Sequence, residues 1–278
     1  MGIEAVAALR KRPAVKRVRR VAIFVAVLAP AAWLLPIPTA LLVACGVIDV
    51  LRHRTITVRL FEHYFMGNGI LTWMLSPLNL LADLLSYRTP GVCRLDDLPA
   101  THRAEIVACT QALVASAAEV KAHVANSLAE NRRGMFTFKW YDQPQAPTLR
   151  IADFEREYRF IKTIALSVFN TRERTTWHFG PLRFTYRVLF NLDPVDSREV
   201  FIEVDGRTHY WCDDPLFIFD DTYFHRSVNG VDHVRYCLFM DIVRPNRWHA
   251  LFDGAVHAVS VISGSFQRVF YKNWSFLR

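Results

Sequence analysis

The chain has 278 residues, a length that allows one large domain or two small ones, so one folded domain with appended segments is expected. Its composition is 52% hydrophobic and 13% aromatic and its formal net charge is +8, which together favour a membrane-attached protein over a nucleic-acid binder. Its five cysteines are scattered and include no Cys-x-x-Cys pair, so they indicate neither a disulfide framework nor a zinc site and fit a reducing compartment.

The chain begins with a basic segment that is followed by an apolar one. Residues 1–20 carry seven Lys or Arg side chains and are predicted to form a basic cytoplasmic N-terminus. No charged residue occurs from Val21 to Ile48, a run long enough to cross a bilayer and longer than the core of a secretory signal. Prolines interrupt this run and basic residues flank it on both sides. Residues 21–51 are therefore predicted to form a transmembrane helix or a helical hairpin with both ends in the cytoplasm.

Two further segments precede the region rich in strand formers. Residues 52–100 are apolar but broken by glycine, proline and polar residues, so we expect an interfacial or linker segment rather than a second span. The stretch from about Thr101 to Arg133 has helical spacing and good helix formers, and it predicts one or two helices at the start of a domain over residues 101–246.

Five short runs rich in β-branched and aromatic residues follow, separated by turn residues. They cover residues 159–169, 182–192, 198–206, 215–221 and 233–243. This spacing predicts an antiparallel sandwich or jelly roll. The last segment, residues 247–278, is predicted to be an amphipathic tail that lies on the domain or on the membrane.

Two longer segments, residues 175–192 and 216–245, combine strand texture with histidine and arginine. His178 stands nine residues before Arg187, and His225 stands ten residues before Arg235. In a jelly roll, facing strands could bring two neutral imidazoles together as ligands of Fe(II), while an arginine deeper in the barrel binds a carboxylate. The spacing leaves an alternative open, in which the histidines are structural and the arginines pair with acidic residues, namely Asp220, Asp221 or Asp241.

The order of the motifs resembles a known family. "HFGP" at residues 178–181 is followed by Arg187, then by "FDDTYFH" at 219–225, Arg235 and "LFMDIVRP" at 238–245. This pattern is similar to that of the aspartyl/asparaginyl β-hydroxylase family, whose members are Fe(II)- and 2-oxoglutarate-dependent dioxygenases. The resemblance covers about residues 135–246. It implies a mainly β fold with flanking helices, a double-stranded β-helix or jelly roll, to which the N-terminal membrane helices are added.

Carried over residue by residue, the resemblance implies that His178 and His225 bind the iron. Gly180 stands where most 2-oxoglutarate oxygenases have a third, carboxylate ligand. The absence of that carboxylate is normal in this family. Asp221 would orient metal-bound water or an imidazole without binding the metal itself.

The resemblance also implies the cosubstrate site. Arg235 and Ser167 would hold the distal carboxylate of 2-oxoglutarate, Arg187 would meet the end nearer the metal, and Trp140 would line the pocket. O2 is the other cosubstrate. Leu189 departs from the pattern, because family members often carry a histidine at that position.

The N-terminal organisation resembles bacterial lipid A 2-hydroxylases and similar enzymes acting on ornithine lipids. A membrane lipid is therefore the expected substrate, with the catalytic domain on the cytoplasmic side of a bacterial inner membrane and no nucleic acid as a partner. One alternative is β-hydroxylation of Asp or Asn in a peptide or protein, or of a small molecule. Another is a non-catalytic, membrane-anchored barrel that binds a ligand, which Leu189 favours. The sequence leaves the oligomeric state open.

Overall fold

A computed structural model describes residues 13–128, 132–145, 148–263 and 275–277. The chain divides into two compact units. The first comprises residues 1–81 together with the short segment 178–182, and the second comprises residues 82–177 and 183–278. The "HFGP" motif therefore belongs to the same unit as the N-terminal helices.

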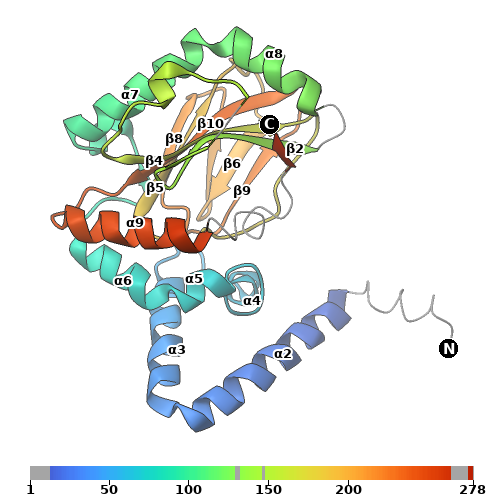
Figure 1. Ribbon diagram of the computed structural model, residues 1–278. Helices are drawn as coiled ribbons and strands as arrows, with labels where there is room; N and C mark the ends of the chain where they lie inside the picture. Colours follow the sequence, from blue (N-terminus) through green and yellow to red (C-terminus); the bar gives the residue numbers. More distant parts are fainter. Residues whose placement is uncertain (1–12, 129–131, 146–147, 264–274, 278) are drawn as a thin grey trace. The chain divides into compact units, whose positions relative to one another are not determined.

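The first unit is helical. Its helices are α2 (Pro13–Leu34), α3 (Pro36–Leu51), α4 (Val58–Met66), α5 (Ile70–Met74) and the start of α6 (Ser76–Leu85). Helices α2 and α3 meet at Leu35, whose φ of −135° and ψ of 66° are not helical, and they form a V in Figure 1. Pro36 explains this break, because proline lacks an N–H and disfavours helical backbone at the residue before it.

The predicted membrane crossing of residues 21–51 is not confirmed. Of the helices in the described ranges, none has both the length and the apolarity that crossing a membrane requires. The sequence prediction treated the apolar run as one or two spans, whereas the described structure divides it between α2, which begins with basic residues, and the 16-residue α3.

The second unit contains a large sheet in the order β1-β8-β5-β10-β4-β2-β11, with β3 paired to β2. Its strands are β1 (Val92–Cys93), β2 (Arg133–Trp140), β3 (Gln143–Pro144), β4 (Ile161–Phe169), β5 (Thr185–Asn191), β8 (Leu216–Phe219), β10 (Arg235–Val243) and β11 (Ser275–Leu277). The sequence did not indicate β11, which pairs in parallel with β2 and lies inside the predicted amphipathic tail.

A smaller sheet has the order β7-β6-β9, with β6 (Val200–Val204), β7 (Arg207–Tyr210) and β9 (His225–Asn229). A bridge from Arg174 to Val228 adds the segment before His178 to the free edge of β9. From β4 to β10 the chain passes from the large sheet to this bridge, back to β5, to the β6–β7 hairpin, to β8, to β9 and to β10, so it crosses repeatedly between the two sheets, as in a jelly roll. The predicted mainly β jelly-roll fold with flanking helices is confirmed.

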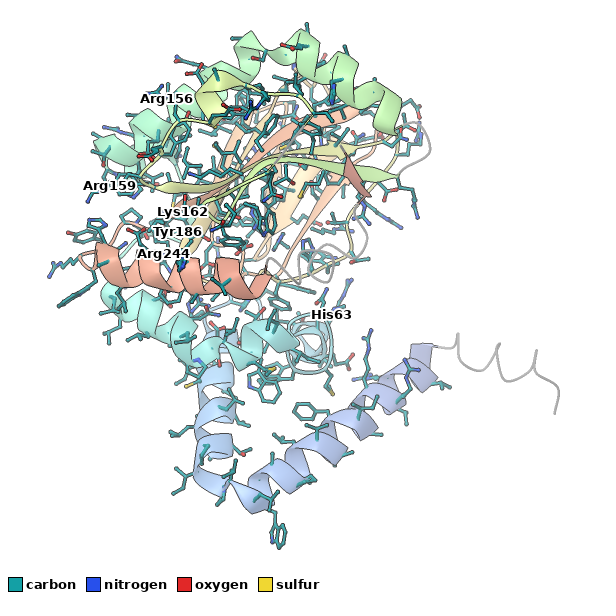
Figure 2. The ribbon with its side chains drawn as sticks, viewed as in Figure 1. His63, Arg156, Arg159, Lys162, Tyr186 and Arg244 are labelled. Atoms are coloured by element: carbon teal, nitrogen blue, oxygen red, sulfur yellow. The ribbon has the colours of Figure 1, made fainter. Side chains whose placement is uncertain are left out.

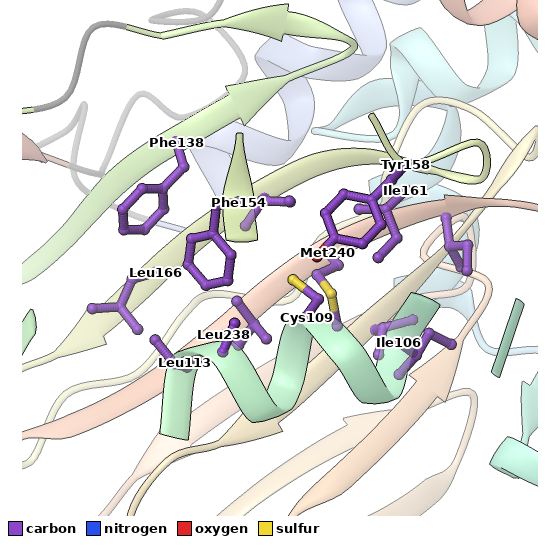
Figure 3. Packing of buried hydrophobic residues seen from close by; sticks show 14 of the residues in the cluster. Ile106, Cys109, Leu113, Phe138, Phe154, Tyr158, Ile161, Leu166, Leu238 and Met240 are labelled. Carbon is purple, nitrogen blue, oxygen red and sulfur yellow. The ribbon is translucent and has the colours of Figure 1, made fainter. Parts of the chain in front are cut away.

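Helices cover the outer face of the large sheet. They are α7 (Ala100–Ala115) and α8 (Ala117–Leu128), into which the predicted helical stretch divides, with the short 3-10 helices Leu95–Asp97 and Ala152–Phe154. Helix α9 (His249–Ser263) packs through Phe252 on Phe184, the residue before β5, with ring centroids 4.9 Å apart. Ile106, Cys109 and Leu113 of α7 pack on Leu166 of β4 and Leu238 of β10 (Figure 3). This cluster is the main hydrophobic core.

A second apolar cluster fills the space between the two sheets. Strands β4 and β10 are buried at every position, because helices cover one face and the small sheet covers the other. The side chains of β10 alternate, so that Leu238 and Met240 face the helices while Cys237 and Phe239 face the small sheet. The same alternation places Arg235 and Asp241 on the inner face.

Candidate active site

Arg235 lies on the inner face without an acidic partner. Its side chain is 3% exposed, and its Nη2 donates to the hydroxyl of Ser227 at 2.9 Å. Its Nε and Nη1 are buried without hydrogen-bond acceptors, and no carboxylate in the described ranges forms an ion pair with it. Burial lowers the pKa of the guanidinium. A buried cation with unused donors is costly unless an anion joins it, so the arrangement suits a carboxylate ligand.

Aromatic rings fix the plane of that guanidinium. The ring centroid of Phe169 lies 4.3 Å from its central carbon, and that of Trp211 lies 5.3 Å away. The indole Nε1 of Trp211 is also buried without an acceptor. Neither Trp211 nor Ser227 can be predicted from the motifs, because neither residue belongs to one. Only the structure shows that they neighbour Arg235.

Ser167 lies close to this group along the sheet. Phe169 is the register partner of Arg235, and Ser167 is two residues before Phe169, so Ser167 and Arg235 are diagonal neighbours on the inner face. The hydroxyl of Ser167 donates to the carbonyl oxygen of Cys237 at 3.2 Å. The structure therefore brings these two predicted cosubstrate residues to one region of the barrel.

His225 opens strand β9 and points into the same interior. Its Nδ1 donates to the carbonyl oxygen of Tyr223 at 2.8 Å, which leaves the lone pair of the neutral ring on Nε2. Its ring makes an edge contact with Phe219, with centroids 5.1 Å apart. Ser227 is two residues further along β9 on the same buried face, so its Cα atom lies about 7 Å from that of His225.

Arg187 lies on the inner face too, but two aspartates neutralise it. Its Nη2 is 2.9 Å from Oδ2 of Asp221 and its Nε is 2.9 Å from Oδ1 of Asp241, its register partner on β10. Its guanidinium carbon is 3.9 Å from the centroid of the Phe239 ring. The alternative of ordinary salt bridges thus describes Arg187, while Arg235 has no such partner among the described residues.

The triad of Arg187, Asp221 and Asp241 carries more negative than positive charge. Burial raises the pKa of Asp221 to about 7, with Arg187 opposing the shift and Asp241 adding to it. Asp241 Oδ2 is buried without a hydrogen-bond partner. One proton shared within this triad would balance its charge near neutral pH.

Asp220, the neighbouring acid of the motif, belongs to a separate ion network. Its Oδ2 is 3.2 Å from Nε of the buried Arg183, which also binds Asp83 at 2.9 Å. Asp83 in turn binds Arg244, whose guanidinium carbon lies 4.9 Å from the ring centroid of Tyr186 (Figure 2). The roles of the two adjacent aspartates therefore differ, with Asp220 tied to this network and Asp221 to Arg187.

The other predicted site residues also occupy buried positions. Trp140 ends β2 at 3% exposure and makes an edge contact with Tyr141. Leu189 lies in the inner apolar cluster opposite Phe239 of β10. Both contribute to the lining of the barrel interior.

His178 belongs to the first unit, with the segment 178–182. The residue before it, Trp177, belongs to the second unit and stacks on Phe224 with ring centroids 4.8 Å apart. In the described ranges, no group of three or more His, Cys, Asp or Glu side chains is placed to hold a metal ion.

Comparisons with known proteins agree with the motif assignment. A search of curated proteins finds the ornithine lipid ester-linked acyl 2-hydroxylase of Rhizobium tropici, 31% identical over 93 residues. The match covers 33% of this chain and 33% of the relative, so the chain spans about a third of that relative's length.

The solved structures that match this chain are more distant in sequence. An oxidoreductase of the 2OG-Fe(II) oxygenase family from Burkholderia pseudomallei is 13% identical, with a TM-score of 0.28 over 45% of this chain and 80% of that one. A prolyl hydroxylase from Trichoplax adhaerens is 15% identical, with a TM-score of 0.34 over 68% of this chain and 96% of that one.

The model of one family matches residues 102–245, more than half of the chain and the whole region that carries the motifs described above. The chain belongs to the aspartyl/asparaginyl β-hydroxylase family.

Proposed function

We propose that this protein is an Fe(II)- and 2-oxoglutarate-dependent hydroxylase acting on the acyl chain of a membrane lipid. The observation that carries the proposal is the buried Arg235, whose unused donors have no acid among the described residues to neutralise them. A dicarboxylate such as 2-oxoglutarate would supply that negative charge from outside the chain.

The residues present fit the metal as well as the cosubstrate. The hydrogen bond from Nδ1 of His225 to Tyr223 leaves Nε2 as the donor atom for a borderline metal, which is the tautomer that a neutral imidazole ligand needs. His178 would be the second ligand. When bound, the metal and its cosubstrate would supply the activation of dioxygen for hydroxylation of a C–H bond, with 2-oxoglutarate converted to succinate and carbon dioxide.

The protein's own residues would hold the reactants in place. Arg235, Ser227 and Ser167 would bind the distal carboxylate, and the aromatic rings of Phe169 and Trp211 would hold the guanidinium flat and keep water out. Asp221 and Asp241 would hold Arg187 close to the His225 end of the barrel and offset its positive charge there.

The lipid substrate is supported by the surface of the first unit and by the curated relative, an ornithine lipid hydroxylase. Trp33, Leu34 and Ile37, at the turn between α2 and α3, are 83%, 66% and 72% exposed. Arg19, in the first third of α2, and Arg54, in the bend that follows α3, are exposed as well. An apolar surface with basic residues at its edges suits the anionic face of a membrane. On this proposal, the enzyme works at the cytoplasmic side of a bacterial inner membrane.

The test is oxygen uptake and succinate formation by the full chain with Fe(II), 2-oxoglutarate and vesicles containing ornithine lipid or lipid A, with His225→Ala as the control. We expect lipid-dependent succinate release that the variant lacks. Mass spectrometry of total lipids with and without the gene should show which lipid gains one oxygen.

The outcomes separate the alternatives. Turnover with an Asp- or Asn-containing peptide and not with lipid would exclude the lipid substrate alone. The absence of turnover and of bound iron would favour a ligand-binding barrel, in which Leu189 fills the position where the family often has histidine.

A further inference from the structure

The short segment that carries His178 is held by the N-terminal helices. Segment 178–182 belongs to the first unit although it lies between two parts of the second unit in the sequence. The hydroxyl of Thr72 donates to the carbonyl oxygen of Gly180 at 3.0 Å, and Nδ2 of Asn79 donates to that of Pro181 at 3.1 Å. Thr72 and Asn79 are 1% and 0% exposed. Two buried side chains thus donate hydrogen bonds to the backbone carbonyls of the two residues that follow His178 and Phe179.

An aromatic cage holds Phe179, the residue next to His178. The ring of Tyr64 meets that of Phe179 at 81° with centroids 5.4 Å apart, and the ring of His53 meets it at 80° and 6.0 Å. A Cβ on Gly69 would lie 2.8 Å from Cδ2 of Phe179, so a larger residue there would displace the ring. Phe179 is therefore enclosed by rings from two sides and by backbone from another.

The cage is in turn tied to α3. The hydroxyl of Tyr64 donates to Oδ2 of Asp49 at 2.6 Å, and Asp49 is 1% exposed and pairs with Arg52. Nδ1 of His53 donates to the carbonyl oxygen of Val50 at 3.1 Å. These bonds orient both cage rings from the end of the helix that follows the exposed apolar turn.

We propose that the N-terminal helices position the first metal ligand, with Thr72, Asn79, Tyr64 and Phe179 acting as positioning residues for His178. The inference rests on the proposed role of His178 as a ligand. A ligand imidazole needs its backbone held within about 0.5 Å of the productive position, and His178 sits beside these fixed points.

The test compares two neighbouring residues of α5 in the full-length protein. Thr72→Val removes the donor to Gly180 and keeps the shape of the side chain. Trp73→Phe removes a donor from the same helix, but its Nε1 binds the carbonyl oxygen of Leu42, 3.1 Å away, and not the segment of His178. The affinity and absorption spectrum of Co(II) report the metal site, and thermal stabilisation by glutarate reports the Arg235 region independently.

We expect Thr72→Val to weaken Co(II) binding about tenfold to a hundredfold, as loss of a residue supporting a metal ligand does, without changing glutarate binding. Thr72→Ser should restore Co(II) binding, and Trp73→Phe should leave it unchanged. Equal Co(II) affinities for Thr72→Val and Trp73→Phe would overturn the inference. If His178→Ala leaves Co(II) binding unchanged, the proposed metal site fails and the inference fails with it; if His178→Ala abolishes binding while Thr72→Val has no effect, only the inference fails.

Discussion

Arg187 and Arg235 are both buried on the inner face of the large sheet, yet their surroundings differ. Arg187 binds two aspartates, whereas Arg235 has one serine hydroxyl and no acid in the described structure. The family resemblance assigns both arginines to the cosubstrate. The charge of Arg187 is thus balanced within the chain, whereas no acid in the described ranges balances that of Arg235.

The first prediction tests this difference by removing each guanidinium in turn and measuring the free energy of unfolding. Arg187→Met leaves two buried carboxylates without their cation and should lower the free energy of unfolding by about 3–5 kcal/mol. Arg235→Met, which removes an unpaired buried charge, should leave that free energy unchanged or raise it. Urea unfolding of both variants checks this, and equal losses would contradict the difference between the two sites.

The second prediction concerns ligand binding. Arg235→Met should weaken binding of glutarate, a five-carbon diacid that needs no metal, by about 2–5 kcal/mol because the charge-assisted hydrogen bonds are lost. Arg235→Lys should restore binding only in part, since an ammonium cannot present the planar fork. Calorimetry checks both variants, and full binding by Arg235→Met would place the carboxylate elsewhere.

The third prediction uses pH. The pKa of Asp221 is raised from 3.8 to about 7, so between these values the folded protein keeps a proton that the unfolded chain releases. The stability from this group is therefore complete below about pH 4 and is lost as the pH rises through 7. Asp221→Asn, which mimics the protonated acid, should gain stability over the wild type across this window, by at most about 4 kcal/mol.

Urea unfolding of metal-free protein at a series of pH values measures that difference. Parallel pH profiles for the wild type and Asp221→Asn would show that Asp221 is charged throughout, and the triad would then hold no proton.

The fourth prediction, which has the smallest expected effect, tests whether the indole of Trp211 contributes to ligand binding beside Arg235. Trp211→Phe keeps the ring over the guanidinium and removes the indole N–H, which should weaken glutarate binding by about 1.5–3 kcal/mol. The exposed Trp248→Phe is the matched control and should bind like the wild type. If Trp211→Phe also binds normally, the indole does not contact the carboxylate.

Much of the barrel could be read from the sequence. The five apolar runs became β4, β5, β6, β8 and β10, because β-branched and aromatic residues between turns fit a buried, pleated surface. The motif spacing was sufficient to identify the family. The segment of residues 52–100 was harder to interpret, since periodicity and hydropathy do not reveal that its Thr72 and Asn79 bind a segment about one hundred residues away.

Five of the strands, the family and the residue types that the chemistry requires could all be inferred from the sequence alone. The tertiary structure was needed to show that Arg187, and not Arg235, has acidic partners, because the register of β5 and β10 places Asp241 opposite Arg187. It also placed Trp211 and Ser227 beside Arg235 and assigned the segment of His178 to the N-terminal helices. These are contacts between residues far apart in the chain, which folding sets and local sequence patterns do not encode.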